Sequence, residues 1–482
     1  MRLSTRGFLL VAASVAALAA VSCVSTPPAR DTTVENVENA EKPSKFKYTR
    51  IAFGERLNKL LEKGKFDEAI AFFDVVPEPD ASDFTIRMLK LSVLISAGKA
   101  EESAALANEL EATNPQNPEI LYTQAVLAGT RKELKKRADY LGRILAIQPN
   151  HGRALSELGM DYLSQRNYPK AKATLIKAIA AEPDNEEALF ALAHTYYMVQ
   201  ELDKARSTLD LAIEKRPNYS PLWAERARVR SETSENLGAI EDAKKAISLS
   251  PEVYSYRTEL GSYYIASGKQ PEARAAYGEA IKLDPNQYLA YIYRAGLNDD
   301  LGNVDEAISD YSKVCEIYPA YYYAFESLGV LLWGKGDYER SGEAFEQALR
   351  RNPKTASYAL MRTLCLYQLG KADEARTFMG KYITTLDRGK DDYFLCRLFV
   401  DRSGDAEVIS RIMKEKNLNV RNRMLFYSAM YYNLFQSKSV AQKYLIEITS
   451  QQAPSFFEFR LSKWALRDID AKASEGATNS QG

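Results

Sequence analysis

Apolar residues in this chain form two helical runs separated by a short break, and the arrangement recurs along the chain. In residues 152–185 the apolar positions before the break at 165–167 are Leu155, Leu158, Tyr162 and Leu163, and those after it are Ala171, Leu175, Ala178 and Ile179. Both sets keep the spacing of one helix face, which predicts two amphipathic helices of about thirteen residues joined by a tight turn.

Prolines mark the same boundary in every repeat of this pattern. They lie 34 residues apart, at Pro115, Pro149, Pro183, Pro217, Pro251, Pro285, Pro319 and Pro353. Proline lacks a backbone N–H and clashes with the preceding helical turn, so each one separates two helix pairs. A fixed period of this length predicts a solenoid of stacked repeats, an architecture with long exposed faces.

Small residues recur where two helices must approach closely. In the 34-residue repeats, the eighth position is small in Ala125, Gly159, Ala193, Ala227, Gly261, Ala295 and Gly329. The twentieth position of the repeats is small in Ala69, Ala171, Ala205, Ala239, Ala273, Ala307, Ser341 and Ala375. Large residues occupy the complementary positions: Phe73, Leu175, Leu209, Tyr277, Tyr311 and Phe345. A bulky side chain at the small positions would push the helix axes beyond normal packing distance.

These residues resemble the tetratricopeptide repeat. The resemblance implies an all-α, right-handed superhelical solenoid of antiparallel helix pairs. Residues 48–389 are expected to hold about ten repeats, beginning near 50, 84, 118, 152, 186, 220, 254, 288, 322 and 356. Residues 390–470 are expected to hold degenerate repeats and a capping helix over 456–470, and residues 471–482 a disordered tail.

The N-terminus indicates export and lipidation. Two arginines in MRLSTR precede the apolar stretch 7–22 and Cys23, an order typical of a secretory signal over 1–22. The stretch is shorter than the ~20 residues that span a bilayer. Ala20-Val21-Ser22-Cys23 resembles a bacterial lipobox, which implies cleavage before Cys23 and lipid attached to it. An ordinary signal with a coincidental cysteine is the alternative. The polar segment 23–47 is expected to be a flexible tether.

Charge and cysteine content exclude several classes of protein. Lys plus Arg and Asp plus Glu number 64 each, so no basic excess favours nucleic-acid binding. Apart from Cys23, the cysteines are Cys315, Cys365 and Cys396, which fall in different repeats. Three cysteines scattered over different repeats are a poor disulfide framework, so we expect all three to be small buried side chains.

No catalytic or metal motif stands out. The two histidines, His151 and His194, belong to no HExxH or Cys–His cluster. Acidic pairs recur at the start of second helices, at Asp67-Glu68, Asp305-Glu306 and Asp373-Glu374. Negative charge at this end of a helix interacts favourably with the exposed backbone N–H groups and with the helix dipole. We therefore expect no enzyme, no metal and no cofactor.

The resemblance also implies a partner-binding groove. In the family, first helices line the concave face, with the second, fifth, ninth and twelfth residues turned inward. Carried onto this chain, the expected groove residues are Tyr122, Met160, Phe190, His194, Tyr197, Arg228, Tyr323, Trp333, Leu360 and Tyr367. Aromatic residues are enriched at interface centres. Packing of these residues against adjacent repeats is the alternative. Lys at the fifth and Asn at the ninth position, which grip C-terminal carboxylates in some relatives, do not recur, so no such clamp is expected.

These features lead to a functional hypothesis. We expect a lipid-anchored scaffold in a bacterial cell envelope, facing the periplasm from the outer membrane. It would bind a protein or peptide in its groove during assembly of an envelope complex. The alternative is a ligand-binding accessory of a periplasmic transport system, which predicts a closed apolar pocket. Oligomeric state is left open.

Overall fold

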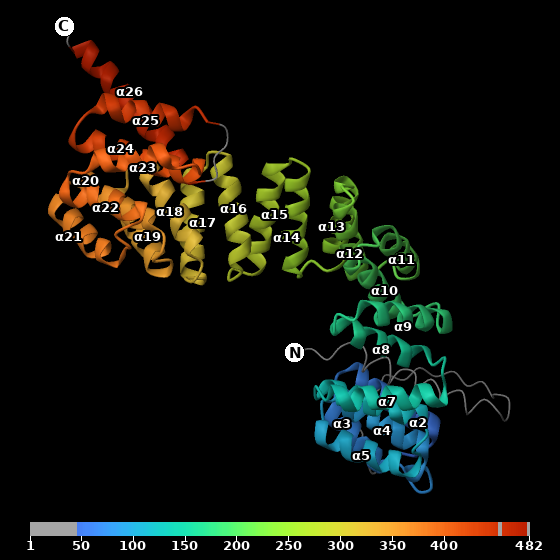
Figure 1. Ribbon diagram of the computed structural model, residues 1–482. Helices are drawn as coiled ribbons and strands as arrows, with labels where there is room; N and C mark the ends of the chain where they lie inside the picture. The colour runs from blue at the N-terminus through green and yellow to red at the C-terminus, as the bar shows by residue number, and fades with distance from the viewer. Residues whose placement is uncertain (1–45, 452–455, 480–482) are drawn as a thin grey trace. The chain divides into compact units, whose positions relative to one another are not determined.

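The computed structural model describes residues 46–451 and 456–479, and every regular element within these ranges is a helix (Figure 1). The predicted all-α array of helix pairs is therefore confirmed. The predicted signal 1–22, Cys23 and nearly all of the tether lie outside the described residues. The chain divides into two compact units, unit 1 ending at Pro217 and unit 2 beginning at Asn218.

Unit 1 consists of consecutive helix pairs. They are α2 (Arg50–Glu62) with α3 (Phe66–Ala71), α4 (Phe84–Ser96) with α5 (Ala100–Thr113), α6 (Pro118–Thr130) with α7 (Leu134–Ile147), α8 (Gly152–Ser164) with α9 (Tyr168–Ala181), and α10 (Glu186–Met198) with α11 (Leu202–Lys215). Short 3-10 turns, η2 (Phe72–Val75) and η3 (Asp80–Ser82), follow α3.

Unit 2 continues the same pattern. Its pairs are α12 (Ser220–Glu232) with α13 (Asn236–Leu249), α14 (Tyr254–Ala266) with α15 (Gln270–Leu283), α16 (Tyr288–Asp300) with α17 (Val304–Ile317), α18 (Tyr322–Gly334) with α19 (Tyr338–Arg351), and α20 (Ala356–Gln368) with α21 (Ala372–Tyr382). First helices thus begin at the residues where the sequence places its repeats.

One backbone conformation sets the turn inside each pair. The fifteenth residue of each repeat has a positive φ, between 58° and 78°. These residues are Gly64, Gly98, Lys132, Arg166, Gln200, Ser234, Gly268, Gly302, Gly336 and Gly370. A left-handed residue ends the first helix and reverses the chain, and glycine adopts it without steric cost.

Close packing inside each pair explains the small eighth residues. A β-carbon on Gly159 would lie 2.6 Å from Cγ of Leu175, and one on Gly329 would lie 2.9 Å from Cε2 of Phe345. Both large side chains are buried with no exposed surface. The complementary small and large positions predicted from the sequence therefore meet in the core.

The C-terminal part of unit 2 departs from the regular period. It holds η4 (Ile383–Thr385), α22 (Asp391–Asp401), α23 (Asp405–Lys414), α24 (Leu418–Phe435), α25 (Lys438–Thr449) and α26 (Glu458–Asn479). Helix α26 runs past residue 470, into the segment for which the sequence predicts disorder. Residues 471–477, AKASEGA, lack large apolar side chains but are rich in good helix formers.

Candidate partner-binding faces

The first helices α6, α8 and α10 carry an apolar face in unit 1. We call it face 1, made of Tyr122, Val126, Met160, Leu163, Phe190, His194 and Tyr197. All seven side chains are half-buried, whereas the neighbouring helix positions that point into the repeats are buried. Helices α8 and α10 pack directly against each other, so their inner positions form a continuous surface.

A buried ionic network fixes the edge of face 1. The Tyr122 hydroxyl donates to Glu157 Oε1 at 3.3 Å, and Arg137 of α7 binds Glu157 and also Asp161, the latter at 2.8 Å. Burial opposes the charge of Arg137, but the two carboxylates outweigh it and raise the pKa of the guanidinium. Glu157, itself bound by Arg137, therefore holds the Tyr122 side chain in place before any partner binds.

Face 1 extends further than the sequence predicted. Met198, at the end of α10 and beside Tyr197, is 41% exposed. The His194 and Tyr197 rings lie 6.2 Å apart and close to parallel. Methionine and aromatic side chains adapt to apolar partners. The family pattern counts only four inward positions in each first helix, and Met198 is the thirteenth residue of its repeat, so that pattern missed it.

The corresponding face of unit 2 begins as a polar surface. Arg228 donates to Glu225 at 2.7 Å and to Glu259 at 2.9 Å. Burial opposes its charge, but these carboxylates raise the pKa of the guanidinium. Arg228 therefore ties α12 to α14, and its expected role as a partner contact stays a prediction.

Tyr323 is the one expected aromatic contact of unit 2 that stays exposed, at 50%. Its ring lies 4.2 Å from that of Tyr322 and 5.7 Å from that of Tyr321. Leu289, the second residue of the preceding first helix α16, is also 50% exposed. This tyrosine cluster is a smaller and separate apolar surface of unit 2.

The expectation for Trp333, Leu360 and Tyr367 needs correction. Trp333 is 8% exposed and Leu360 1%, in a core that they share with residues of α24 and α26. The Tyr367 hydroxyl donates to the carbonyl of Phe399 at 3.0 Å, and its ring meets Phe435 edge-on at 5.1 Å. The chain's own C-terminal helices cover these residues, so they offer no open groove in this structure.

Potentially reactive side chains have structural partners. Cys365 and Cys396 are buried and Cys315 is half-buried, all as free thiols. Burial raises the pKa of Cys315 and of Cys365 to about 12, which keeps both protonated and unreactive. His151 caps α8, with Nδ1 accepting from the Ala154 N–H at 3.2 Å.

The predicted acidic pairs lie in the first turns of α3, α17 and α21. No capping side chain accepts a hydrogen bond at these three helix starts. The carboxylates instead reach lysines of the next repeat, as in the pairs Asp67–Lys99 and Asp305–Lys335. Their contribution is therefore to the helix dipole and to contacts between repeats.

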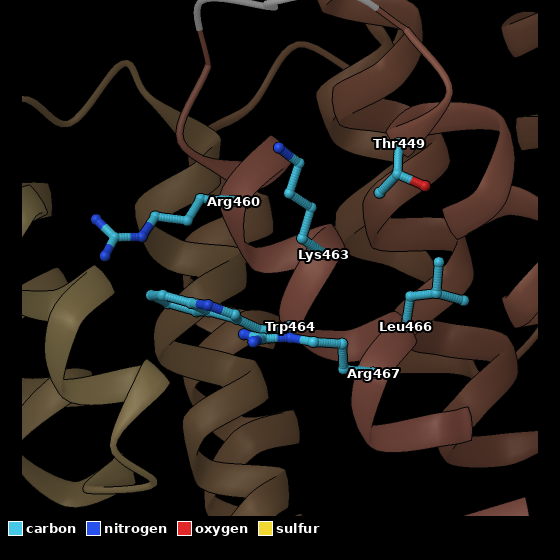
Figure 2. Close-up of a pocket in the computed structure, with 6 residues that line it drawn as sticks. All are labelled: Thr449, Arg460, Lys463, Trp464, Leu466 and Arg467. Atoms are coloured by element: carbon cyan, nitrogen blue, oxygen red, sulfur yellow. The ribbon is translucent and has the colours of Figure 1, made fainter. Parts of the chain in front are cut away.

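Two cavities among the described residues have both apolar and charged side chains in their lining. Beside α26, Figure 2 shows a cavity of about 510 Å³ lined by Thr449, Arg460, Lys463, Trp464, Leu466 and Arg467. Another, of about 770 Å³, is lined in part by Arg350, Lys354, Asp387 and Lys390. Both cavities open widely to solvent, whereas small-ligand transport predicts a closed apolar pocket. Among described residues, no group of His, Cys, Asp or Glu is placed to hold a metal ion.

Within residues 46–451 and 456–479, no helix combines the length and the apolar character needed to cross a bilayer.

Family comparisons agree with the repeat pattern. One tetratricopeptide repeat model matches residues 162–229, and a second model of the same description matches residues 227–322 and 327–388. These regions of the chain therefore carry tetratricopeptide repeats.

Individual relatives cover only part of the chain. Hsp70-Hsp90 organizing protein 3 of Arabidopsis thaliana is 28% identical over 145 residues, 29% of this chain and 26% of that protein. DnaJ homolog subfamily C member 3 of Homo sapiens is 26% identical over 144 residues, 30% of this chain and 27% of that protein. The chain thus spans about a quarter of the length of these curated relatives.

Solved structures give similar partial matches. Pseudomonas aeruginosa PilF is 21% identical, and the match covers 43% of this chain and 94% of that one with a TM-score of 0.37. A tetratricopeptide repeat protein from Parabacteroides merdae is 18% identical, and the match covers 52% and 97% of the two chains with a TM-score of 0.36.

Proposed function

We propose that this chain, which carries tetratricopeptide repeats within residues 162–388, is a membrane-tethered scaffold that binds a protein or peptide on face 1. The observation that carries the proposal is the half-exposed apolar surface of Tyr122, Met160, Phe190 and Tyr197, with the exposed Met198 at its edge. Clustered aromatic side chains can bury a large area at low entropic cost, which favours a protein contact.

The proposed anchor is lipid on Cys23. The arginines, apolar stretch and small residues before Cys23 support export and lipidation. Several acyl chains anchor a protein stably where one does not. The proposed location is the periplasmic side of a bacterial outer membrane, and the proposed task is assembly of an envelope complex. Relatives named as organizing proteins support scaffolding.

The experiment that tests the proposal is capture by the full-length chain from solubilised envelopes of the cell that produces it. A partner should co-purify with the unaltered chain and with Leu211→Ala, since Leu211 is exposed on the second helix α11. It should be reduced about tenfold by Phe190→Ala with Tyr197→Ala, the loss expected for interface anchors. Equal capture by all three chains would contradict the proposal, and a co-purified small molecule in native mass spectrometry would favour the transport alternative.

A further inference from the structure

Helix α26 lies across the inward positions of three first helices of unit 2. Both terminal nitrogens of Arg460 bind the carboxylate of Asp299 in α16, at 2.5 and 2.7 Å. The indole of Trp464 fills the space left by Gly334 at the end of α18, where a β-carbon would lie 2.7 Å from the ring. These two residues are the twelfth and thirteenth of their repeats, at the edge of the inward face.

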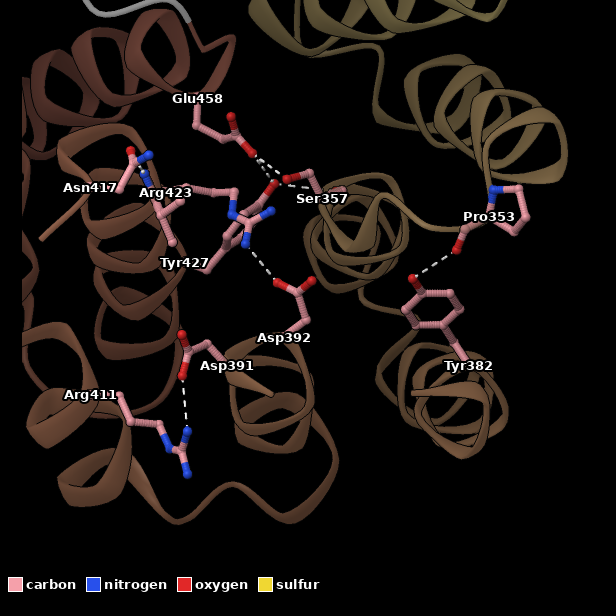
Figure 3. Close-up of polar contacts among 11 residues, drawn as sticks. Pro353, Ser357, Tyr382, Asp391, Asp392, Arg411, Asn417, Arg423, Tyr427 and Glu458 are labelled. Carbon is pink, nitrogen blue, oxygen red and sulfur yellow. Dashed lines mark hydrogen bonds and ion pairs between the residues drawn. The ribbon is translucent and has the colours of Figure 1, made fainter. Parts of the chain in front are cut away.

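The start of α26 contacts the next first helix. The Ser357 hydroxyl of α20 donates to Glu458 Oε1 at 2.5 Å, and the Tyr427 hydroxyl of α24 donates to the same oxygen at 2.9 Å (Figure 3). The Phe457 ring lies 6.3 Å from that of Tyr358 and close to parallel. Helix α26 therefore engages α16, α18 and α20 through a charge, an aromatic ring and a carboxyl group.

Capping does not require this arrangement. A terminal element of a solenoid needs to cover only the last repeat, because each repeat contacts only its neighbours. Helix α26 does pack on α24 and α25, but it also reaches Asp299, 161 residues before Arg460 in the chain. Two of the contacted residues, Asp299 and Ser357, fall on the inward register of the repeats, and Gly334 lies one residue beyond it.

The chemistry of this contact differs from that of a permanent core. Glu458 is 2% exposed, and Glu326 on the inward side of α18 accepts a hydrogen bond from the Tyr358 hydroxyl at 2.5 Å. Burial raises the pKa of both carboxyl groups, and the charge of Glu458 adds to the shift of Glu326. Burying two neighbouring acids costs free energy that an apolar seal would not. Exchangeable interfaces are more polar than cores in this way.

We infer that the inward face of α16, α18 and α20 is a second binding surface, specific for an amphipathic helix, which α26 occupies until a partner helix replaces it. Asp299 selects an arginine, Gly334 leaves room for an indole, and the hydroxyls of Ser357 and Tyr427 select a carboxyl group. The partner helix carries these groups in the order and spacing of Glu458, Arg460 and Trp464. This surface is in unit 2 and is independent of face 1.

A reciprocal charge exchange tests the inference in the full-length chain. One variant carries Arg460→Asp with Trp464→Ala, the other Asp299→Arg with Trp464→Ala, and both weaken occupation by the chain's own helix. The probes are fluorescein-labelled peptides of residues 456–471, one of natural sequence and one with Arg460→Asp. Binding is measured by fluorescence anisotropy, and circular dichroism checks helicity.

The variant with Arg460→Asp and Trp464→Ala should bind the natural peptide at least about tenfold more tightly than the peptide with Arg460→Asp. The variant with Asp299→Arg and Trp464→Ala should show the opposite preference. The unaltered chain should bind neither, because its own α26 competes at high effective concentration. An Arg467→Asp control should behave like the unaltered chain, because Arg467 is exposed. Binding of neither peptide by folded variants, or loss of helicity in them, would show that α26 is a fixed part of the fold.

Hydrogen exchange on the unaltered chain gives a second, independent measurement. Local release of α26 should let its amides exchange roughly tenfold faster than those of α18 and α20. Equal protection of the three helices would overturn the inference without any substitution.

Discussion

The ring of Tyr277 in α15 fills the space next to Gly261 in α14, where any other residue would place its β-carbon. A β-carbon on Gly261 would lie 2.7 Å from Cζ of Tyr277, whose side chain is 1% exposed. The glycine is thus required by its neighbour, and the ring fills the gap that the missing side chain leaves.

Gly261→Ala should therefore lower the free energy of unfolding, by about 1–3 kcal/mol, because the buried ring must move. Gly296→Ala is the matched control, since Gly296 is also in a first helix and nothing lies within 4 Å of its added carbon. The control should gain up to about 1 kcal/mol from helix propensity. Urea unfolding followed by circular dichroism measures both, and equal effects would contradict the packing argument.

The left-handed turns give a prediction of opposite sign. Lys132, Arg166, Gln200 and Ser234 hold φ between 58° and 63°, where the equivalent residues of other repeats are glycine. Replacing Arg166 with glycine should raise the free energy of unfolding by up to about 1 kcal/mol, because it removes backbone strain. Gly302→Ala should lower it, since Gly302 has φ of 78°. A stabilising Gly302→Ala would show that the turn conformation is misassigned.

The buried carboxyl of Glu458 predicts a pH dependence. Ser357, Tyr427 and Arg423 face it and favour its ionised form, but burial is the larger effect and raises its pKa above 4.5. The folded state then holds a proton that the unfolded state loses, so stability falls as pH rises from 4.5 through the folded pKa. Each tenfold increase in the proton affinity of the folded carboxyl lowers the free energy of unfolding at neutral pH by about 1.4 kcal/mol.

Glu458→Gln should abolish most of this dependence. The variant should be more stable than the unaltered chain at neutral pH and should lose that advantage in acid, in melting temperatures measured across the range. Glu326, whose pKa burial also raises, leaves a residual slope. Parallel curves for the two chains would mean that Glu458 is not the titrating group.

Lipidation at Cys23 predicts where the chain is found in the cell. Cys23→Ser should move it from the membrane fraction to the soluble periplasmic fraction, since the acyl chains provide the anchor. Mass spectrometry of the N-terminal peptide should show the added lipid only in the unaltered chain. Membrane association of the serine variant, without lipid, would contradict the proposed anchor.

The sequence predicted the repeats better than it predicted their surfaces. The period of the prolines and the pairing of Gly261 with Tyr277 depend on neighbours close in the chain, and a single pattern specifies both. Covering of Trp333 by α26 depends on a contact between residues more than a hundred positions apart. The sequence predicted a capping helix over 456–470, but not which surface that helix would cover.

The sequence pattern also predicted face 1 incompletely. The inward register of the family predicted Phe190 and Tyr197 as groove residues, and both are half-buried on first helices, but their contact with a partner stays a prediction. Met198 was missed because the family pattern ends one residue earlier. The non-glycine turn residues, such as Arg166, also gave no signal, since their strained conformation is imposed by the repeats on either side.

Site-specific photo-crosslinking tests the central claim most directly. A photoreactive phenylalanine is placed at Tyr197 on face 1 or at the exposed Leu211 of α11, and the chain is irradiated in its own cells. The account predicts a crosslinked protein partner from position 197 and none from position 211. A partner crosslinked from position 211 but not from position 197 would contradict the assignment of face 1 as the binding surface.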